Sequence, residues 1–242
     1  MYGDTDSVFV WLAQSTESAD VLGPQLTDYL NGWWRDYLLG NFQLKSFLEV
    51  EYETHFERFL MPTVRGSDKG SKKRYAGLIR DDGRQRLVFK GLEAVRSDWS
   101  QLAKEFQKEL YRRVFLEEPF EDYIRLTVDA LRSGQYDEKL VLRKRLRRKL
   151  DDYEKNVPPH VRAARRAQEI RRARGLPMTS TFGGGWIEYL MTLNGPEPRL
   201  YRDSPIDYQF YIDRQLTPIA DAILSFKSAS LGAIVDKQMG LF

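Results

Sequence analysis

The sequence of 242 residues contains no cysteine and only two histidines, His55 and His160. Without cysteine the chain has neither a disulfide framework nor a thiolate for catalysis or metal binding. This composition suits a reducing compartment such as the cytoplasm. Two histidines so far apart in sequence offer little to a zinc site or to a histidine-based catalytic triad. The chemistry left to this chain is therefore that of carboxylates and cations.

Long hydrophobic stretches are also missing. No apolar run reaches the ~18 residues of a membrane-spanning helix, and the first residues lack the basic-then-apolar pattern of a secretory leader. Charged residues make up 30% and aromatic residues 13% of the chain, which is typical of a folded protein rather than a disordered one. We expect a folded chain with one or two hydrophobic cores and no membrane partner.

Positive charge is concentrated in one segment. The whole chain carries +3, but residues 139–174 hold fourteen Lys and Arg against four acidic residues, a local balance of +10. Because four carboxylates cannot neutralise fourteen cations, this segment predicts a surface that binds a polyanion. The alternative interpretation is a solvated helix surface with internal salt bridges. The candidate contacts in this segment are Arg143, Lys144, Arg145, Arg147, Arg148, Arg162, Arg165 and Arg166.

Two closely spaced aspartates occur in the string Tyr-Gly-Asp-Thr-Asp-Ser at residues 2–7, just before an apolar run. Asp4 and Asp6, at i and i+2 on extended backbone, project to the same face, and Gly3 lets the chain bend just before them. Because adjacent carboxylates repel each other, such a pair typically binds a hard cation such as Mg²⁺.

Two other interpretations of this string are open. One is a β-hairpin with a solvated acidic turn, in which the aspartates bind local backbone groups. The other is the Asp-x-Asp nucleophile of haloacid-dehalogenase-like phosphatases, which follows a buried apolar strand. Only Met1, Tyr2 and Gly3 precede Asp4, and no alternation of strands and helices follows. The phosphatase interpretation is therefore disfavoured.

Hydrophobic periodicity predicts an α+β fold. We expect a helix over 18–39 whose apolar and aromatic stripe lies in the core, and a long strand over 47–61. Two apolar runs around Asp82 and Gly83 predict a β-hairpin. Further predictions are amphipathic helices over 102–115 and 123–132, a helix from Pro159, a strand over 183–190 and a helix opened by Ser204 and Pro205. The side chains expected to be buried on the helix over 102–115 are Leu102, Phe106, Leu110 and Val114.

Three acids, Glu49, Glu51 and Glu53, alternate along the predicted strand over 47–61 and share one of its faces. Because unpaired acids are costly to bury, we expect this face to be wet or to lie near a cation.

The order of these motifs resembles DNA polymerases of family B. Their motif C contains the string found at residues 2–7. The resemblance implies that Asp6 is a ligand of the two catalytic Mg²⁺ ions and that Asp4 assists on the same face. In that family an acidic strand lies against the motif C hairpin, so Glu51 is implied as a further ligand.

A second motif supports the resemblance. The run Lys72-Lys73-Arg74-Tyr75, at the entrance of the predicted hairpin, resembles the Lys-x-Tyr motif that contacts the primer–template backbone. A lysine offers a phosphate a point charge, and a tyrosine packs against a sugar while donating its hydroxyl. Residues 158–164 resemble the thumb element with which bacterial members of the family grip duplex product, which adds His160 to the implied DNA contacts.

The resemblance implies two domains. Residues 1–92 would be the C-terminal part of the palm, a small antiparallel sheet with a packed helix, and residues 93–242 a mainly α-helical thumb. The motif A aspartate and the motif B lysine of the family are absent. We therefore expect a palm and thumb fragment or a split subunit, inactive alone, located with DNA in the cytoplasm (nucleoid). It would need an N-terminal polymerase portion to act on primer–template DNA and deoxynucleoside triphosphates. The alternative is a stand-alone duplex-binding module without chemistry.

The C-terminal residues resemble the sliding-clamp peptide of bacterial replication and repair enzymes. Ser228, Ser230 and Gly232 precede this tail and predict that it is mobile. Two apolar side chains on a free end can dock into a pocket of a partner; the alternative is that Leu241 and Phe242 cover the thumb's own core. The implied clamp contacts are Gln238, Met239, Leu241 and Phe242.

Overall fold

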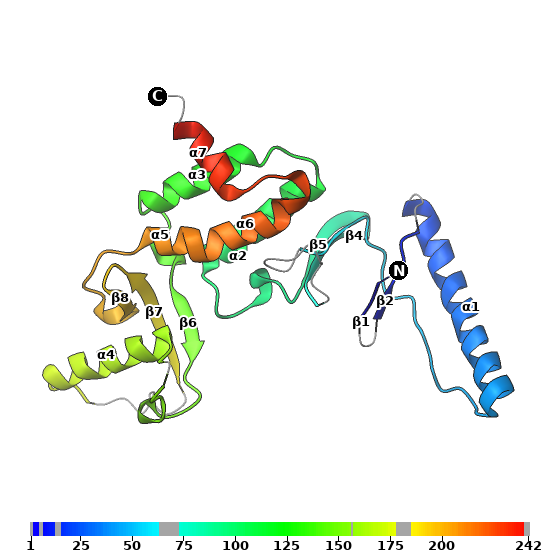
Figure 1. Ribbon diagram of the computed structural model, residues 1–242, viewed down its shortest axis with the longest axis horizontal. Coiled ribbons are helices and arrows are strands. Elements are labelled where there is room, and N and C mark those ends of the chain that lie inside the picture. Colours follow the sequence, from blue (N-terminus) through cyan, green and yellow to red (C-terminus); the bar gives the residue numbers. More distant parts are fainter. Residues whose placement is uncertain are drawn as a thin grey trace. The chain divides into compact units, whose positions relative to one another are not determined.

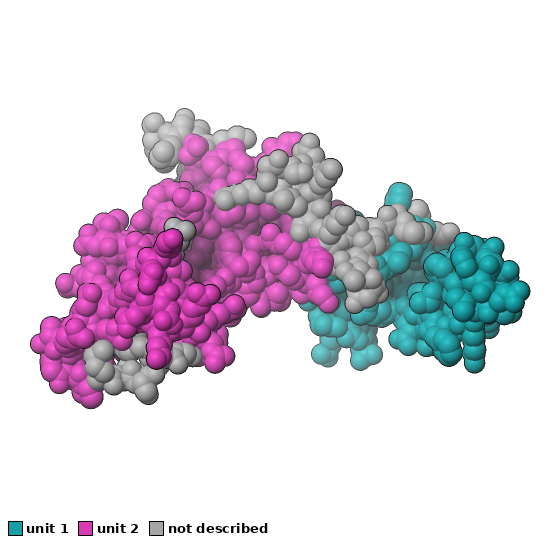
Figure 2. Space-filling view, turned by 60° about the horizontal axis from the view of Figure 1, so that its bottom comes forward, with its two compact units in different colours: residues 1–60, 75–88 teal, residues 61–74, 89–242 magenta. Residues whose placement is uncertain are grey.

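The computed structural model describes residues 2–4, 7–12, 16–62, 73–155, 157–177 and 185–239. Helices and small sheets of two or three strands alternate along the described chain, so the predicted α+β class is confirmed. The chain divides into two compact units (Figure 2). The first unit comprises Met1–Leu60 and Tyr75–Val88, and the second comprises Met61–Arg74 and Phe89–Phe242.

The first unit begins with a hairpin and a long helix. Strands β1 (Tyr2–Asp4) and β2 (Ser7–Phe9) are antiparallel, with Asp4 opposite Ser7. Helix α1 (Thr16–Phe42) covers the predicted helix and extends it at both ends. Its aromatic stripe is not in a core, contrary to the prediction, since Tyr29 is 67% and Trp33 44% exposed. In the described part of this unit no layer covers that side of α1.

The predicted strand over 47–61 forms only at its end. Strand β3 (Arg58–Leu60) pairs with β4 (Tyr75–Asp81), whereas residues 43–57 form neither helix nor strand. The side chain of Asn31 on α1 takes the place of a partner strand. Its amide donates to the carbonyl of Val50 over 2.9 Å and accepts from the Val50 N–H over 2.8 Å. Glu49, Glu51 and Glu53 are exposed, as expected for a wet face.

The predicted Asp-Gly hairpin is present. Strands β4 (Tyr75–Asp81) and β5 (Arg84–Lys90) flank Asp82 and Gly83, whose φ values are +47° and +76°. Two successive residues with positive φ are typical of the tight turn that matches the twist of a hairpin. The sheet order is β3-β4-β5.

The second unit has a helical core. Helices α2 (Gln101–Phe115) and α3 (Glu121–Arg132) match the predicted helices, and the four side chains expected inside α2 are at most 8% exposed. Ser100 begins α2 by accepting from the Ala103 N–H over 3.2 Å, an N-cap. Helix α6 (Thr217–Leu224) packs against α2, and α7 (Leu231–Met239) packs against α3 (Figure 1).

The helix expected at Ser204 and Pro205 begins later. Ser204 binds the carboxylate of Glu197 through its N–H and its hydroxyl, so it is not free to cap a helix. Asp207 caps α5 (Tyr208–Tyr211) by accepting from the Phe210 N–H over 2.9 Å. A π-helical turn, Ile212–Leu216, then leads into α6.

A three-stranded sheet and a helix complete the second unit. Strands β6 (Leu142–Arg145), β7 (Trp186–Thr192) and β8 (Gly195–Pro198) pair in that order, and α4 (Pro159–Ala173) packs on β7 and β8 (Figure 1). The sequence did not indicate β6, because three of its four residues are basic. Leu146, Leu150, Val161 and Ala164 form a buried cluster beneath α4. The short 3₁₀ turns are Glu93–Val95, Asp137–Lys139, Leu150–Asp152, Arg199–Tyr201 and Ser225–Lys227.

Two observations concern the ends and the length of the helices. Gln238 and Met239 lie in the last turn of α7, and the clamp-binding tail stays a prediction. Leu241 and Phe242 lie outside the described residues. Among the described helices, none is both long and apolar enough to span a membrane.

Candidate nucleic-acid interface

The predicted metal ligands lie largely outside the described side chains. Asp4 ends β1, but its side chain is not described, and Asp6 lies outside the described residues. Glu51 is exposed in the segment between α1 and β3. Within the described ranges, no three His, Cys, Asp or Glu side chains come together as a metal-binding group. The metal site at residues 2–7 therefore stays a prediction.

The residues of the Lys-Lys-Arg-Tyr run have different surroundings. Lys72 lies outside the described residues, and Lys73 is exposed. The ring of Tyr75 packs among Phe9, Phe56 and Phe59, with centroid distances of 5.3, 5.9 and 5.2 Å. This aromatic cluster fixes the orientation of the Tyr75 ring.

Arg74, between Lys73 and Tyr75, does not face solvent as a free cation. Its guanidinium pairs with Glu93, whose side chain is 9% exposed, and the Nε atom of Arg74 is buried. The prediction that Arg74 contacts the primer–template competes with this internal partner.

Several cations of the basic segment are held inside the protein. Lys144 pairs with Asp98 over 2.9 Å. Arg165 donates to the carbonyls of Leu150 and Tyr153, each over 2.9 Å. These groups have partners that a phosphate would have to displace, so they are weaker candidates for DNA contact than the sequence suggested.

Arg166 is tied to a buried carboxylate. It pairs with Glu197 over 2.9 Å, and Glu197 is 0% exposed. Burial acts to raise the pKa of Glu197, but the N–H groups of Asp203 and Ser204, the Ser204 hydroxyl and Arg166 outweigh it and lower the pKa. The ionised carboxylate therefore holds β8, the segment after it and α4 together.

Asp98 shows how strongly Lys144 is engaged. The pKa of Asp98 lies well below its usual range, chiefly because Arg96 donates to it and secondarily because Lys144 does, against the effect of burial. Arg96 and Lys144 share this one carboxylate, so Lys144 has an internal partner but is not fully neutralised by it.

Other cations in the segment stay exposed. Arg143 lies over the ring of Trp186, 4.6 Å from its centroid, and Arg145 is exposed on the same strand. Arg147, Arg148 and Arg162 are exposed, and their side chains make no ion pair or hydrogen bond within the described part of the chain. These three arginines can bind a phosphate without losing an internal partner.

His160 is a packing residue. It stands second in α4, is half-buried, and meets the ring of Tyr153 edge-on at 6.5 Å. Burial, and secondarily the charge of Lys144, lower its pKa. Because the ordinary value is ~6.5, His160 is neutral at pH 7 and offers no positive charge to a phosphate.

Trp186 is a candidate contact that sequence reasoning missed. It is 45% exposed and lies opposite Arg145 and diagonal to Arg143 in the β6–β7 ladder. Aromatic side chains beside cations provide stacking surfaces for nucleotides. The unpredicted pairing of β6 with β7 is what brings Trp186 to these arginines, and no pattern around residue 186 indicates it.

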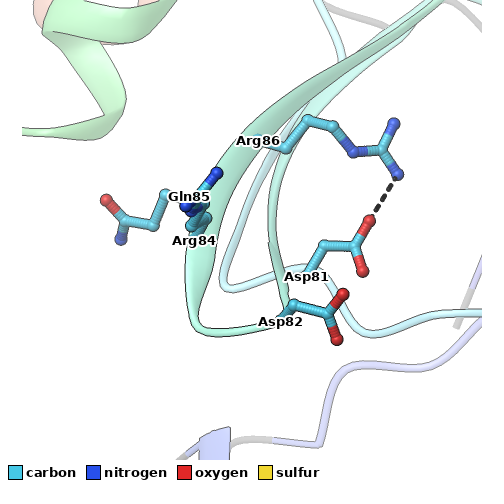
Figure 3. A pocket seen from close by; sticks show the side chains of 5 residues that line it. All are labelled: Asp81, Asp82, Arg84, Gln85 and Arg86. Atoms are coloured by element: carbon cyan, nitrogen blue, oxygen red, sulfur yellow. Dashed lines mark hydrogen bonds and ion pairs between the residues drawn. The ribbon is translucent and has the colours of Figure 1, made fainter.

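A hollow at the tip of the β4–β5 hairpin is not a candidate site. Figure 3 shows its lining, which comes from five consecutive or nearly consecutive residues. Arg86 pairs with Asp81 over 3.4 Å, both 60% exposed. The hollow is an open surface with balanced charge, and it contains none of the predicted site residues. Its lining is Asp81, Asp82, Arg84, Gln85 and Arg86.

The two kinds of arginine on α4 should differ in their effect on stability. Arg166→Met leaves Glu197 without its cation, so the free energy of unfolding should fall by about 1–3 kcal/mol. Arg162→Met, on the same helix but exposed, should change it by no more than about 0.5 kcal/mol. Urea denaturation followed by circular dichroism measures both, and equal effects would contradict the assignment of Arg166 to an internal pair.

Comparison with known proteins gives a consistent result. The family model described as DNA polymerase family B matches residues 1–226. DNA polymerase II of Escherichia coli is 54% identical over 100% of this chain, and the match covers 31% of that protein. DNA polymerases of Pyrococcus horikoshii and Thermococcus gorgonarius are 28% and 27% identical over the whole chain, covering 19% and 30% of their lengths. The chain thus spans about a third or less of these relatives.

Proposed function

The chain belongs to DNA polymerase family B, and we propose that it supplies the C-terminal part of the palm and the thumb of a DNA-directed DNA polymerase. Residues 1–92 would form the palm portion and residues 93–242 the thumb. One boundary of the two compact units, at residues 88 and 89, lies near this division, whereas residues 61–74 of the palm portion belong to the second unit. The observation that supports the proposal is that Arg147, Arg148 and Arg162 are exposed and have no side-chain partner among the described residues of this family member.

Duplex DNA would bind to these arginines. Arg147 and Arg148 follow β6, and Arg162 lies on α4, so a strand end and a helix present cations from two elements of one unit. Arginine binds phosphate strongly because its planar fork can donate two hydrogen bonds to it. Lys73 would add a phosphate contact from the Lys-x-Tyr run. The ring of Trp186 would pack against sugars of the DNA.

The proposed chemistry is two-metal nucleotidyl transfer with Mg²⁺. Asp6 and Asp4 offer the carboxylate oxygens that this hard cation prefers, and β1 places Asp4 at the end of a hairpin strand. When bound, the two ions would stabilise the attacking and leaving oxygens. Two carboxylates make an incomplete ligand shell, so the motif A aspartate of an N-terminal portion would complete it.

The surface of α1 supports a partner polypeptide. Tyr29, Trp33, Leu39 and Phe42 on α1, and Phe47 just after it, are all exposed. Monomeric proteins rarely expose contiguous large apolar patches. We propose that the N-terminal polymerase portion, which would also bind the deoxynucleoside triphosphate, covers these side chains. The chain alone would then be inactive.

A stand-alone duplex-binding module is the second candidate, favoured by the same exposed arginines. The two functions differ in one test. Addition of a polypeptide with motifs A and B, together with Mg²⁺, should produce primer extension only if the chain is part of a polymerase. A binding module would retain DNA affinity and give no extension with any such partner.

The exposed arginines should set the salt dependence of DNA binding. Replacing Arg147, Arg148 and Arg162 together by Ala should reduce the log–log salt slope of duplex affinity by about 2–3, since each lost phosphate contact contributes about 0.9. Fluorescence anisotropy at several salt concentrations measures the slope. Arg165→Ala is the matched control, because this arginine donates to backbone carbonyls. An unchanged slope in the triple variant would mean that these arginines are a solvated surface only.

Motif C should control incorporation and not DNA binding. In the complex with an N-terminal portion, Asp6→Asn should lower nucleotide incorporation about 10³-fold, since a metal contributes several kcal/mol to the transition state. Asp4→Asn should be milder. Primer extension measures the rate, and anisotropy should show unchanged duplex affinity. The control is Asp82→Asn, an exposed turn carboxylate. Substantial incorporation by Asp6→Asn would contradict the assignment.

The C-terminus would bind a sliding clamp. Gln238, Met239, Leu241 and Phe242 resemble the clamp peptide, and tethering to a ring around DNA would raise processivity through effective concentration. Leu231 and Ile234, the buried side chains of α7, precede this segment.

Deletion of residues 238–242 should therefore abolish clamp binding, measured by calorimetry, and leave duplex affinity intact. The melting temperature should stay the same, because the buried residues of α7 remain. A markedly lower melting temperature would mean that the last residues belong to the core instead.

A further inference from the structure

A buried polar network connects the Lys-Arg-Tyr segment to helix α2. Arg74 pairs with Glu93, which is 7% exposed at the start of a 3₁₀ turn. Gln107 on α2 donates to Glu93 over 2.8 Å and accepts from the Ala94 N–H over 2.6 Å. Gln107 is 2% exposed. The segment that precedes β4 is thereby tied to the first long helix of the second unit.

The backbone of the same segment is fixed by close packing at Gly91. Gly91 has a φ of +63°, a conformation that favours glycine. A Cβ atom at this position would collide with the carbonyl oxygen of Lys73 and would lie 3.4 Å from Cγ of Arg74. Two independent contacts therefore hold residues 73 and 74, one through a side chain and one through the backbone.

The Arg74 side chain is 37% exposed, but part of its guanidinium lies inside the protein. Its Nε atom is buried, as is the hydroxyl of Tyr111 on α2, and neither has a hydrogen-bond partner in the described part of the chain. Burial, and secondarily the charge of Glu93, raise the pKa of Tyr111, so Glu93, Arg74 and Tyr111 share one interior environment. Lys73, which directly precedes Arg74, is exposed.

We propose that Arg74 is a positioning residue, held by Glu93 and Gln107 so that Lys73 is presented to a DNA phosphate. Arg74 itself makes no phosphate contact. The inference rests on the proposed function. If Arg74 left Glu93 to bind a phosphate, the buried charge of Glu93 would lose its cation and the fold would be destabilised. Lys73 is exposed, so it can bind a phosphate without breaking a buried ion pair.

The direction in which one substitution changes duplex affinity distinguishes a positioning role of Arg74 from direct phosphate contact. Glu93→Gln keeps a hydrogen-bond acceptor for Gln107 but removes the charge that holds Arg74. Positioning predicts weaker duplex binding and a salt slope reduced by up to about 0.9, as one phosphate contact is lost. If Arg74 were a restrained phosphate ligand, its release would strengthen binding and steepen the slope, which would overturn the proposal. The control is Glu57→Gln, which removes the charge of a carboxylate, 11% exposed, that pairs with Arg80 and has no contact with Arg74.

A backbone variant tests the same inference without any change of charge. Gly91→Ala should displace Lys73 and weaken duplex binding. Gly83→Ala is matched to it, because Gly83 also has a positive φ, +76°, but faces open space, and it should leave binding intact. Equal affinities for Gly91→Ala, Glu93→Gln and the unsubstituted chain, with folding verified by thermal melts, would overturn the proposal.

Hydrogen exchange tests, without DNA, whether the pair of Arg74 with Glu93 holds residues 73 and 74 in place. We call this arrangement the lock. Amides of residues 73–76 should exchange faster in Glu93→Gln than in Glu57→Gln, and unchanged exchange would overturn the lock whatever the chain binds. A second outcome is also informative. If the chain shows no salt-dependent duplex binding, the proposed function and the presentation of Lys73 are contradicted. Faster exchange in Glu93→Gln would in that case still support the lock.

Discussion

Two buried carboxylates, Glu93 and Glu197, decide which cations of this basic chain remain available to a ligand. A carboxylate that loses water must gain a cation and hydrogen bonds, or the fold is destabilised. Glu93 forms an ion pair with Arg74, and Glu197 forms one with Arg166. Each carboxylate also accepts hydrogen bonds from other groups, Gln107 in one case and Ser204 in the other. These arginines are therefore structural parts of the second unit.

The rest of the candidate interface follows from this division. Other cations stay exposed: Lys73, which precedes Arg74, Arg162, one helical turn before Arg166, and Arg147, which follows β6. Pairing between β6 and β7 adds Trp186 to the same group through Arg143. A surface of this kind binds a polyanion without reading its sequence, as a family B polymerase thumb would require.

Local patterns predicted the local structure well. The Asp-Gly turn, α2 with its four buried side chains, α3 and the start of α4 at Pro159 all follow from turn chemistry and periodicity. Features that depend on distant partners did not follow. The strand over 47–61 forms only at Arg58–Leu60, where β4 pairs with it, while the backbone of Val50 binds the Asn31 side chain. Strand β6 forms although three of its four residues are basic. Likewise, charge counting identified the basic segment, but only tertiary contacts separate Arg147 from Arg166.

Pairing with buried carboxylates or backbone carbonyls separates the structural arginines from those proposed to bind DNA. Arginine-specific chemical modification, mapped by mass spectrometry with and without duplex DNA, tests it most directly. Arg147, Arg148 and Arg162 should react in the free chain and be protected by DNA. Arg74, Arg165 and Arg166 should react slowly in both states. Fast modification of Arg74 and Arg166 in the free chain, with protection by DNA, would contradict the account.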